Sequence, residues 1–267
     1  MLLPGNLEIR GYNKKGYMVM YQFFVEPEQI TGRVVIITGK DVNHIKNVLR
    51  MKVGEEISVS NGIDGKEYRC GIKEFQEDAV VCELRFVKEE GTELPSKIYL
   101  FQGLPKADKM EWIIQKTTEL GVFEIIPVAM KRCVVKLDDK KAASKIARWQ
   151  GIAEAAAKQS KRGVIPQISK VMSFEEAVAY SRQVQIRLLP YELAEDPRKT
   201  KEIISRIKPG QDIAIFIGPE GGFDESEVEL AVKDGMESIT LGKRILRTET
   251  AGMTLLSILM YHLEIFS

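Results

Sequence analysis

An apolar run followed at once by a glycine-rich loop limits most strongly how this chain can fold. Residues 213–217 are all apolar and few enough for one buried strand, and Gly-Pro-Glu-Gly-Gly at 218–222 ends that strand. Asp224 followed by Glu227 is a capping-box pattern that opens a helix, and Gly235 marks its end. Three glycines in five positions let backbone amides approach a ligand closely. The stretch therefore predicts a strand, a ligand loop and a helix of an α/β fold.

The next strand, residues 238–241, leads into a charged loop and then a long apolar helix. The loop spans residues 242–251 and contains Arg247 and Glu249. One interpretation of this pair is a surface salt bridge beside the helix N-terminus. The other is a binding site, because open α/β sheets bind ligands at the carboxyl ends of their strands. The pattern leaves both open, and we expect a second ligand loop here.

Composition narrows the class of protein. The chain has 267 residues, of which 44% are hydrophobic, enough for one large domain and one smaller one. The formal net charge of +1 says little about partners. Three cysteines without paired spacing argue against a disulfide framework and for a reducing cytoplasm. The N-terminus lacks the apolar core of a signal peptide. Residues 251–266 are shorter than a membrane span, which predicts a core or subunit-interface helix.

The pattern of strands and turns divides the chain in two. We expect residues 1–19 to be a disordered N-terminal extension. Between residues 20 and 90, short strands with Asn-Gly and Asp-Gly turns predict a small β-barrel. The polar segment 89–95 is the expected linker. From residue 96 to residue 267, strands and helices alternate, which predicts an α/β domain with a mostly parallel sheet.

Basic residues concentrate in one segment although the net charge is close to zero. Residues 131–162 contain ten Lys or Arg against three Asp or Glu, an excess of seven positive charges. Clustered Lys and Arg suit phosphate binding, because each neutralised phosphate releases counterions. A solvated helix face would have the same composition, and the sequence leaves both interpretations open. Trp149 could stack on a base, but its residue type favours a core anchor.

Several common kinds of site are excluded by missing patterns. Neither GxGxxG nor GxxxxGK followed by Ser or Thr occurs, so the usual dinucleotide and triphosphate loops are not expected. Hydrolase chemistry has no support, because no Gly-x-Ser-x-Gly elbow or catalytic triad order is present. His44 and His262 are too few and too far apart for a metal site, and we expect no metal. The glycine loop favours a non-phosphate ligand or an unusual cofactor fold.

Five segments, taken in order, resemble one known family. The two most specific are Ile-Gly-Pro-Glu-Gly-Gly-Phe at 217–223 and Leu-Gly followed by Ile-Leu-Arg-Thr-Glu-Thr-Ala at 241–251. The others are His-Ile-Lys-Asn-Val-Leu-Arg at 44–50, Gln-Lys-Thr-Thr-Glu-Leu-Gly at 115–121 and Gln-Ser-Lys-Arg at 159–162. From about Met20 to the C-terminus, the chain resembles the RsmE family of SPOUT-class methyltransferases, which modify N3 of one uridine in 16S ribosomal RNA. Cys133 departs from the family pattern, in which a serine is expected.

The resemblance implies a SPOUT-type α/β methyltransferase domain with a deep trefoil knot, preceded by a PUA-like β-barrel that binds RNA. It implies the small ribosomal subunit as substrate, without a membrane partner, and a homodimer formed through the knot domain, which suits the apolar helix from Thr250 onward. It also implies S-adenosylmethionine held by three loops. The residues expected to bind this cofactor are Leu188, Leu189, Pro190, Glu192, Ile217, Gly218, Pro219, Glu220, Gly221, Gly222, Leu241, Gly242, Ile245, Leu246, Thr250 and Ala251.

The chemistry of uridine methylation limits the mechanism. N3 of neutral uracil carries a proton, so methylation needs a base for the proton and a cation for the charge that spreads onto O2 and O4. We expect Arg247 to supply the cation and Glu249 to orient the target or take the proton, with Glu220 as the second candidate carboxylate. The side chains expected to contact RNA phosphates, with steep salt dependence, are His44, Arg50, Arg132, Lys161 and Arg162.

Two other classes of function stay open. A tRNA methyltransferase of the same superfamily would share the cofactor knot, although the ordered N-terminal segments speak against it. A non-catalytic RNA-binding or ribosome-assembly factor would have no use for an intact glycine loop. A comparison of tRNA with small-subunit RNA as substrate distinguishes the first class from an rRNA methyltransferase. Failure to bind the cofactor would favour the second class.

Overall fold

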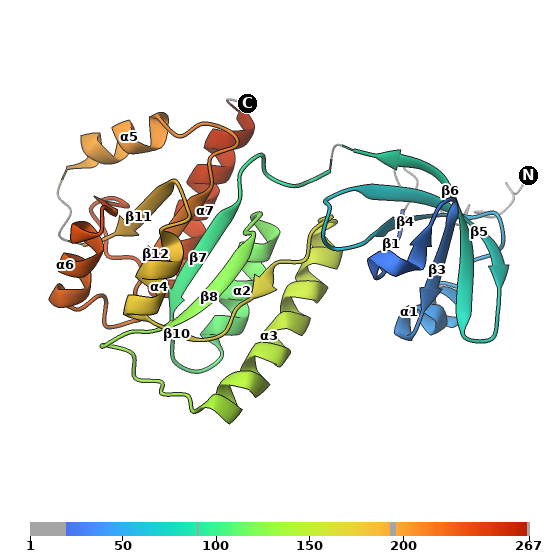
Figure 1. The fold of residues 1–267 in the computed structure, drawn as a ribbon, viewed down its shortest axis with the longest axis horizontal. Coiled ribbons are helices and arrows are strands. Elements are labelled where there is room, and N and C mark those ends of the chain that lie inside the picture. Colours follow the sequence, from blue (N-terminus) through green and yellow to red (C-terminus); the bar gives the residue numbers. More distant parts are fainter. Residues whose placement is uncertain (1–19, 90, 193–195, 266–267) are drawn as a thin grey trace, which may run out of the picture. The chain divides into compact units, whose positions relative to one another are not determined.

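A computed structural model of the chain describes residues 20–89, 91–192 and 196–265. They form two compact units, one that ends at Gly91 and one that begins at Thr92 (Figure 1). The predicted extension, residues 1–19, lies outside the described residues. None of the described helices is long and apolar enough to cross a membrane.

The first unit is built on a six-stranded sheet. Its strands are β1 (Gln22–Phe24), β2 (Ile30–Thr31), β3 (Val34–Thr38), β4 (Glu56–Ser60), β5 (Glu67–Phe75) and β6 (Ala79–Lys88), in the order β1-β4-β5-β6-β3-β2. Alternation along β3 buries Val35 and Ile37 and leaves Val34 and Ile36 exposed. The predicted small β domain is therefore confirmed. Within the described residues β1 and β2 do not pair with each other, so the sheet is a half-barrel that stays open.

A short helical segment lies between β3 and β4. The α-helix α1 (Lys40–Asn43) continues directly into one π-helical turn, η2 (His44–Val48), and a 3-10 turn, η1 (Pro27–Gln29), precedes β2. Arg50 follows with a backbone φ of 54°, in the left-handed region that residues other than glycine seldom adopt. This is the segment that carries two of the predicted RNA contacts.

The second unit is an α/β domain with a fully parallel sheet. Its main strands are β7 (Ile98–Gly103), β8 (Glu124–Ala129), β10 (Met172–Ser173), β11 (Ile186–Pro190), β12 (Ile213–Ile217) and β13 (Glu237–Ile239), in the order β10-β8-β7-β12-β11-β13, and β9 (Gln167–Ile168) pairs with β8. Although β12 follows β11 along the chain, it lies between β7 and β11. The parallel sheet predicted for this half is confirmed.

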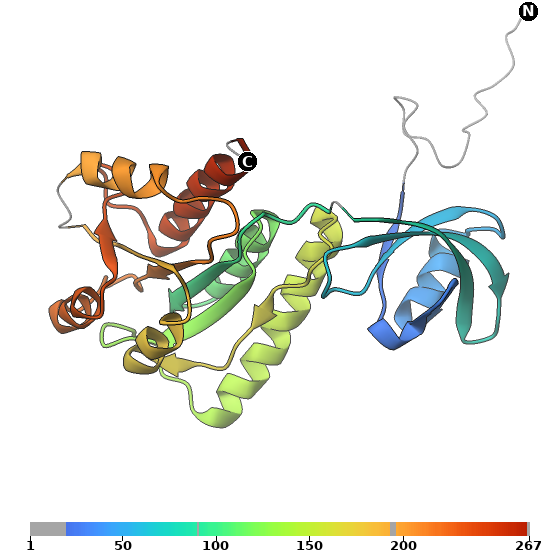
Figure 2. The same cartoon turned by 45° about the horizontal axis from the view of Figure 1, so that its top comes forward.

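Within the described residues of this unit, six α-helices accompany the sheet, and Figures 1 and 2 show how they are arranged around it. They are α2 (Lys109–Glu119), α3 (Asp139–Ser160), α4 (Phe174–Ser181), α5 (Pro197–Ser205), α6 (Glu225–Lys233) and α7 (Thr248–Ile265). Helix α2 packs against both α3 and α7, and α7 also contacts β7 and β12. Trp149 is buried in α3, so it is a core anchor.

Buried aromatic packing fixes the central strands. Every residue of β12 is buried, as the apolar run predicts. Phe216 pairs in register with Phe101 of β7, and their rings stack with centroids 4.3 Å apart and planes 3° from parallel. Phe174 of α4 meets Phe216 edge-on. Such contacts add to the stabilisation from burial alone. They also fix the position of the end of β12, where the glycine loop begins.

The predicted capping box of α6 is present. The Asp224 carboxylate accepts a hydrogen bond from the backbone N–H of Ser226, and the Glu227 side chain accepts one from the backbone N–H of Asp224 at 2.9 Å. Gly235 ends the helix with φ 88°. Helix α7 begins at Thr248, earlier than the apolar pattern indicates, so part of the predicted second loop is helical.

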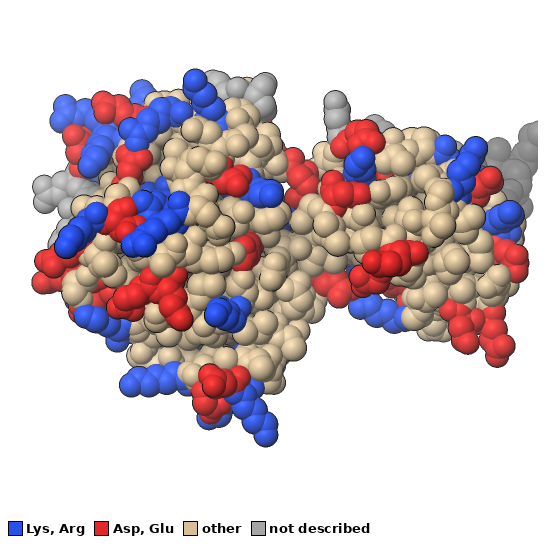
Figure 3. Space-filling view, viewed as in Figure 1, with Lys and Arg blue, Asp and Glu red and all other residues tan. Residues whose placement is uncertain are grey.

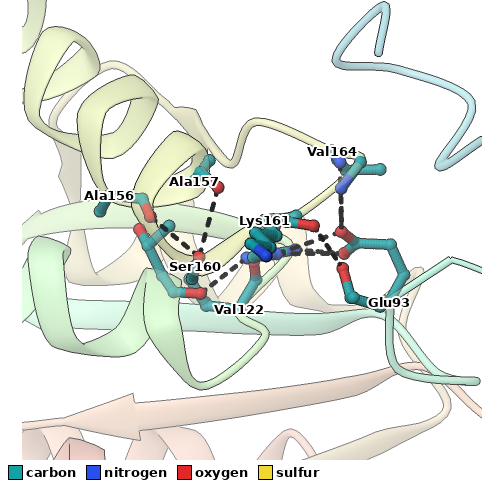
Figure 4. A network of polar contacts seen from close by, with 11 residues as sticks. Glu93, Val122, Ala156, Ala157, Ser160, Lys161 and Val164 are labelled. Atoms are coloured by element: carbon teal, nitrogen blue, oxygen red, sulfur yellow. Dashed lines mark hydrogen bonds and ion pairs between the residues drawn. The ribbon is translucent and has the colours of Figure 1, made fainter. Parts of the chain in front are cut away.

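A buried ion pair holds the first residues of the second unit (Figure 4). The Arg162 guanidinium donates to Glu93 and also to the carbonyls of Thr118 and Val122. Glu93 additionally accepts from the backbone N–H of Val164. The predicted linker is therefore shorter than 89–95, because Glu93 is anchored in this unit. Arg162, predicted as an RNA contact, is only 3% exposed, and its partners give it a structural role instead.

Candidate active site

A cavity of about 430 Å³ lies at the carboxyl ends of β11, β12 and β13. Sites of this size hold small organic ligands, which typically need about 300–1,000 Å³. Three loops meet there, as expected for an open parallel sheet. The lining residues are Lys109, Pro190, Tyr191, Glu192, Ile217, Gly218, Pro219, Glu220, Gly221, Gly222, Phe223, Thr240, Leu241, Gly242, Arg244, Ile245, Leu246, Arg247, Thr248 and Ala251.

Close backbone contacts explain the glycines of the loop at 218–222. A Cβ on Gly218 would lie 3.1 Å from the carbonyl carbon of Gly222, so a side chain there would push the loop open. Gly222 has φ 69°, a conformation that glycine adopts without strain. Gly103 of β7 leaves room for Pro219, because a Cβ added at Gly103 would lie only 2.7 Å from the Pro219 nitrogen. The loop is thus tightly packed against the sheet and has backbone groups in the cavity wall.

A hydrogen-bond relay joins this loop to α7. The Thr248 hydroxyl donates to the carbonyl of Gly218 at 2.6 Å and accepts from the Gln102 side-chain amide at 2.8 Å. Gln102 and Thr248 are both buried, which keeps water from competing for these bonds. The relay fixes the start of α7, and therefore Glu249, relative to the glycine loop.

Three ionisable side chains meet beside the cavity, and two of them, Lys109 and Glu220, line it. The Lys109 ammonium lies 2.9 Å from Glu220 Oε1 and 3.5 Å from Glu249 Oε2. Burial raises the pKa of Glu220, but the hydrogen bonds from Lys109 and from the backbone N–H of Lys106 outweigh it and hold that pKa below its usual value. The hydrogen bond with Glu220 raises the pKa of Lys109, and the charges of both carboxylates act in the same direction. Lys109 and Glu220 are therefore both charged at neutral pH.

Glu249 and Arg247 differ in their surroundings. Glu249 Oε2 is buried and has no hydrogen-bond partner among the described residues. Arg247 is exposed at the cavity, and its guanidinium makes no ion pair or hydrogen bond within the described part of the chain. The salt bridge between these two residues that the sequence left open is thus not formed, and the Arg247 guanidinium is available to a ligand in the cavity.

Most residues predicted to bind the cofactor line the cavity. Exceptions are Leu188 and Leu189, which are fully buried in β11, and Thr250, which is half-buried in α7. Arg247, predicted as catalytic, also lines the cavity, and the lining residues predicted for no role are Lys109, Tyr191, Phe223, Thr240, Arg244 and Thr248. Thr248 lies in residues 241–251, one of the segments that resemble the family, and Lys109 follows the end of β7. Position relative to the strands could therefore have indicated both residues.

The predicted RNA contacts fall in both units. His44 and Arg50 are exposed in the first unit, and Arg132 and Lys161 are exposed in the second. Arg132 also donates to the carbonyl of Gly221 at 3.3 Å, which links it to the cavity loop. On the face drawn in Figure 3, basic and acidic side chains are interspersed, so the local charge excess does not form one uniform patch there. Residues 20–89, 91–192 and 196–265 contain no cluster of His, Cys, Asp and Glu suited to a metal ion.

Comparison with known proteins gives one consistent family. The RNA methyltransferase domain family matches residues 92–260, and the RNA methyltransferase PUA domain family matches residues 37–85. Ribosomal RNA small subunit methyltransferase E of Bacillus subtilis is 41% identical over 253 residues, which cover 92% of this chain and 98% of the Bacillus protein.

Two solved structures agree in fold and sequence. The ribosomal RNA small subunit methyltransferase E of Neisseria gonorrhoeae, bound to S-adenosyl methionine, is 31% identical with a TM-score of 0.77 and covers 90% of this chain and 96% of its own. A methyltransferase of Legionella pneumophila with bound cofactor SAM is 32% identical with a TM-score of 0.76 and covers 91% of this chain and 97% of its own. The chain therefore belongs to the family of RNA methyltransferases that includes the ribosomal RNA small subunit methyltransferase E proteins.

Proposed function

We propose that this protein methylates N3 of a uridine in 16S ribosomal RNA of the small ribosomal subunit, with S-adenosylmethionine as methyl donor. The observation that carries the proposal is a cavity whose wall brings together a glycine loop, Arg247 and Lys109, with the Glu249 carboxylate 3.5 Å from the lysine ammonium. The 41% identity with a ribosomal RNA small subunit methyltransferase supports the choice of substrate.

The cavity suits S-adenosylmethionine in size and chemistry. Ile217, Leu241, Ile245 and Leu246 provide an apolar surface for an adenine ring. Backbone groups of residues 218–222 can bond polar edges, because the glycines expose them. When bound, the cofactor supplies an electrophilic methyl group, whose bond to sulfur breaks with the electron pair left on sulfur. The protein then needs to align the target base and remove its proton.

Glu249 and Arg247 perform the chemistry on the RNA side in this proposal. The Glu249 carboxylate takes the proton from uracil N3, whose electron pair becomes free to bond the methyl carbon. Arg247 stabilises the negative charge that spreads onto O2 and O4 as the proton leaves. Glu249 suits the task of base because no described residue donates a hydrogen bond to its buried oxygen. Glu220 suits it less, because it already accepts hydrogen bonds from Lys109 and Lys106.

We further propose a homodimer through the second unit. Ile258, Tyr261 and Ile265 lie on one face of α7 at helical spacing and are 41%, 62% and 60% exposed. Trp112, 46% exposed on the adjoining helix α2, adds apolar surface. Exposed apolar residues grouped in this way favour a protein partner, here a second copy of the chain.

The remaining parts of the proposal follow from the family. The deep trefoil knot stays a prediction, and the hydrogen bond that joins the start of α7 to the glycine loop, from Thr248 to Gly218, is consistent with it. The PUA-like domain of residues 20–90, the knot domain of residues 96–267 and the cytoplasm as location belong to the same proposal. His44, Arg50, Arg132 and Lys161 are the exposed residues proposed to contact the RNA backbone.

Transfer of a labelled methyl group tests this function. Small subunits from a strain without the corresponding activity are incubated with the protein and labelled S-adenosylmethionine, and the modified nucleoside is identified by mass spectrometry. The expected product is 3-methyluridine in 16S RNA. Another methylated nucleoside, or label only in tRNA, would refute the proposed substrate, and absence of cofactor binding would refute the catalytic proposal altogether.

A further inference from the structure

Lys109, the first residue of α2, is a cation in the cavity wall to which the proposed reaction gives no role. Its ammonium lies between two carboxylates from separate elements, Glu220 of the glycine loop and Glu249 of α7. Its side chain is 30% exposed and those of Glu220 and Glu249 are 27% and 14% exposed. Ion pairs shielded to this degree interact more strongly than surface pairs, because water screens them less.

The contact with Glu249 is specific in geometry. Lys109 approaches Oε2 of Glu249, and this is the oxygen that is buried without a hydrogen bond. Within the described residues Lys109 is the cation that forms an ion pair with it. The lysine therefore restricts where the carboxylate can lie without occupying its oxygen by a short hydrogen bond.

The contact with Glu220 fixes the lysine in place. Glu220 Oε1 also accepts the backbone N–H of Lys106 at 3.1 Å, so this carboxylate is held from two directions. One ammonium shared by two carboxylates leaves one net negative charge in the cluster. The other charged groups that line the same cavity are Glu192, Arg244 and Arg247, and none of them forms an ion pair with Glu249.

We propose that Lys109 is a positioning residue that holds Glu249 oriented for removal of the uracil N3 proton, with Glu220 holding the lysine in place. This inference rests on the proposed function, because it gives Glu249 the role of base. It adds a group that does not touch the reacting atoms and that acts through the carboxylate.

Three variants of one helix test the proposal. Lys109→Met removes the charge, Lys109→Arg keeps it, and Lys116→Met makes the same change at a lysine that pairs with Glu119 elsewhere on α2. We expect Lys109→Met to lower kcat about 10- to 100-fold with cofactor affinity nearly unchanged. Lys109→Arg should restore most of the rate, and Lys116→Met should match the unmodified protein.

A double-mutant cycle asks whether the lysine acts through Glu249. With Glu249→Gln already present, Lys109→Met should cause little further loss of kcat, because the carboxylate that it serves is gone. Additive losses would overturn the proposal. So would a loss of cofactor affinity in Lys109→Met as large as the loss of kcat, since that would place the role of the lysine in holding the glycine loop.

A measurement that does not depend on methyl transfer separates this inference from the proposed function. The titration of the Glu249 carboxyl carbon, assigned by comparison with Glu249→Gln, is followed by ¹³C NMR in the unmodified protein and in Lys109→Met. An upward shift of the midpoint by about one pH unit supports the coupling even if no uridine is methylated. An unchanged midpoint overturns the inference even if 3-methyluridine is formed.

Discussion

The hydroxyl of Thr248 donates a 2.6 Å hydrogen bond to the carbonyl oxygen of Gly218, which joins the first residue of α7 to the first residue of the glycine loop. These residues are thirty positions apart in sequence. The bond is buried, and the Gln102 amide supports it from β7. The cavity is thus held together by side chains that have no apparent part in the chemistry.

Replacement of Thr248 by valine tests this bond. Thr248→Val leaves the Gly218 carbonyl and the Gln102 amide without their partner, which costs about 1–3 kcal/mol for a buried polar group. We expect weaker cofactor binding, by about tenfold, measured by calorimetry. Thr254→Val on the same helix is the control, because no described residue bonds its hydroxyl. Equal affinities of the two variants would contradict this role.

A methyl group on Gly103 should displace the glycine loop from its place against β7. Its Cβ would lie 2.7 Å from the backbone nitrogen of Pro219, a contact that requires backbone movement. Gly103→Ala should therefore reduce cofactor affinity and lower the melting temperature. Gly151→Ala is the matched control, because Gly151 lies in α3 with nothing within 4 Å, and alanine there should stabilise the helix by about 1 kcal/mol. A fully functional Gly103→Ala protein would show that the loop is not held by this contact.

Removal of the proposed base should affect turnover rather than binding. Glu249→Gln should lower kcat for RNA methylation by about 10²- to 10⁴-fold, the range for general acid–base catalysis. Arg247→Ala should reduce kcat as well, because the developing charge on the uracil loses its cation. Equilibrium binding of the cofactor is measured in parallel and should change little. If either variant kept full transfer activity, the role given to that residue would be wrong.

Neighbouring basic residues Lys161 and Arg162 should behave in opposite ways. Arg162→Met leaves Glu93 partly buried without its partner and should lower the free energy of unfolding by about 3 kcal/mol, measured by urea titration. Lys161→Met should leave stability unchanged and reduce the dependence of RNA affinity on log salt concentration by about one unit. The assignment is refuted if Arg162→Met is as stable as the unmodified protein.

A charge on the exposed face of α7 should dissociate the proposed dimer. Tyr261→Lys places an ammonium in the apolar stripe with Ile258 and Ile265, and we expect a monomer by light scattering after size exclusion. Val232→Lys is the control, since Val232 is exposed on α6, away from that stripe. If the unmodified protein is itself a monomer at micromolar concentration, the proposed interface does not exist in solution.

Local patterns predicted the elements around the cavity well. The apolar run 213–217 is β12, the Asp224 capping box opens α6, and the glycines at 218–222 form a tight loop. These features depend on neighbours in sequence, so sequence contains them. The start of α7 was predicted too late, because Thr248 and Glu249 are polar and lie outside the apolar pattern.

Long-range contacts could not be predicted in the same way. Lys109 precedes Glu220 by 111 residues, and no local pattern couples them. Arg162 belongs to a basic segment, which suggested RNA contact, but its guanidinium turns inward to Glu93, 69 residues away. Composition reports how many charges a segment has, whereas the direction of each side chain depends on partners supplied by the fold.

The position of Thr248 in the last described helix limits when, during synthesis of the chain, the cavity can form. Thr248 and Ala251 line the cavity and belong to α7, the final element described. A ribosome adds about 5–20 residues per second, and the residues of the remaining cavity walls are all synthesised before those of this helix. A nascent or prematurely ended chain without α7 would lack one side of the cavity. Cofactor retention therefore offers a direct assay for chains in which α7 has been made and has folded into place.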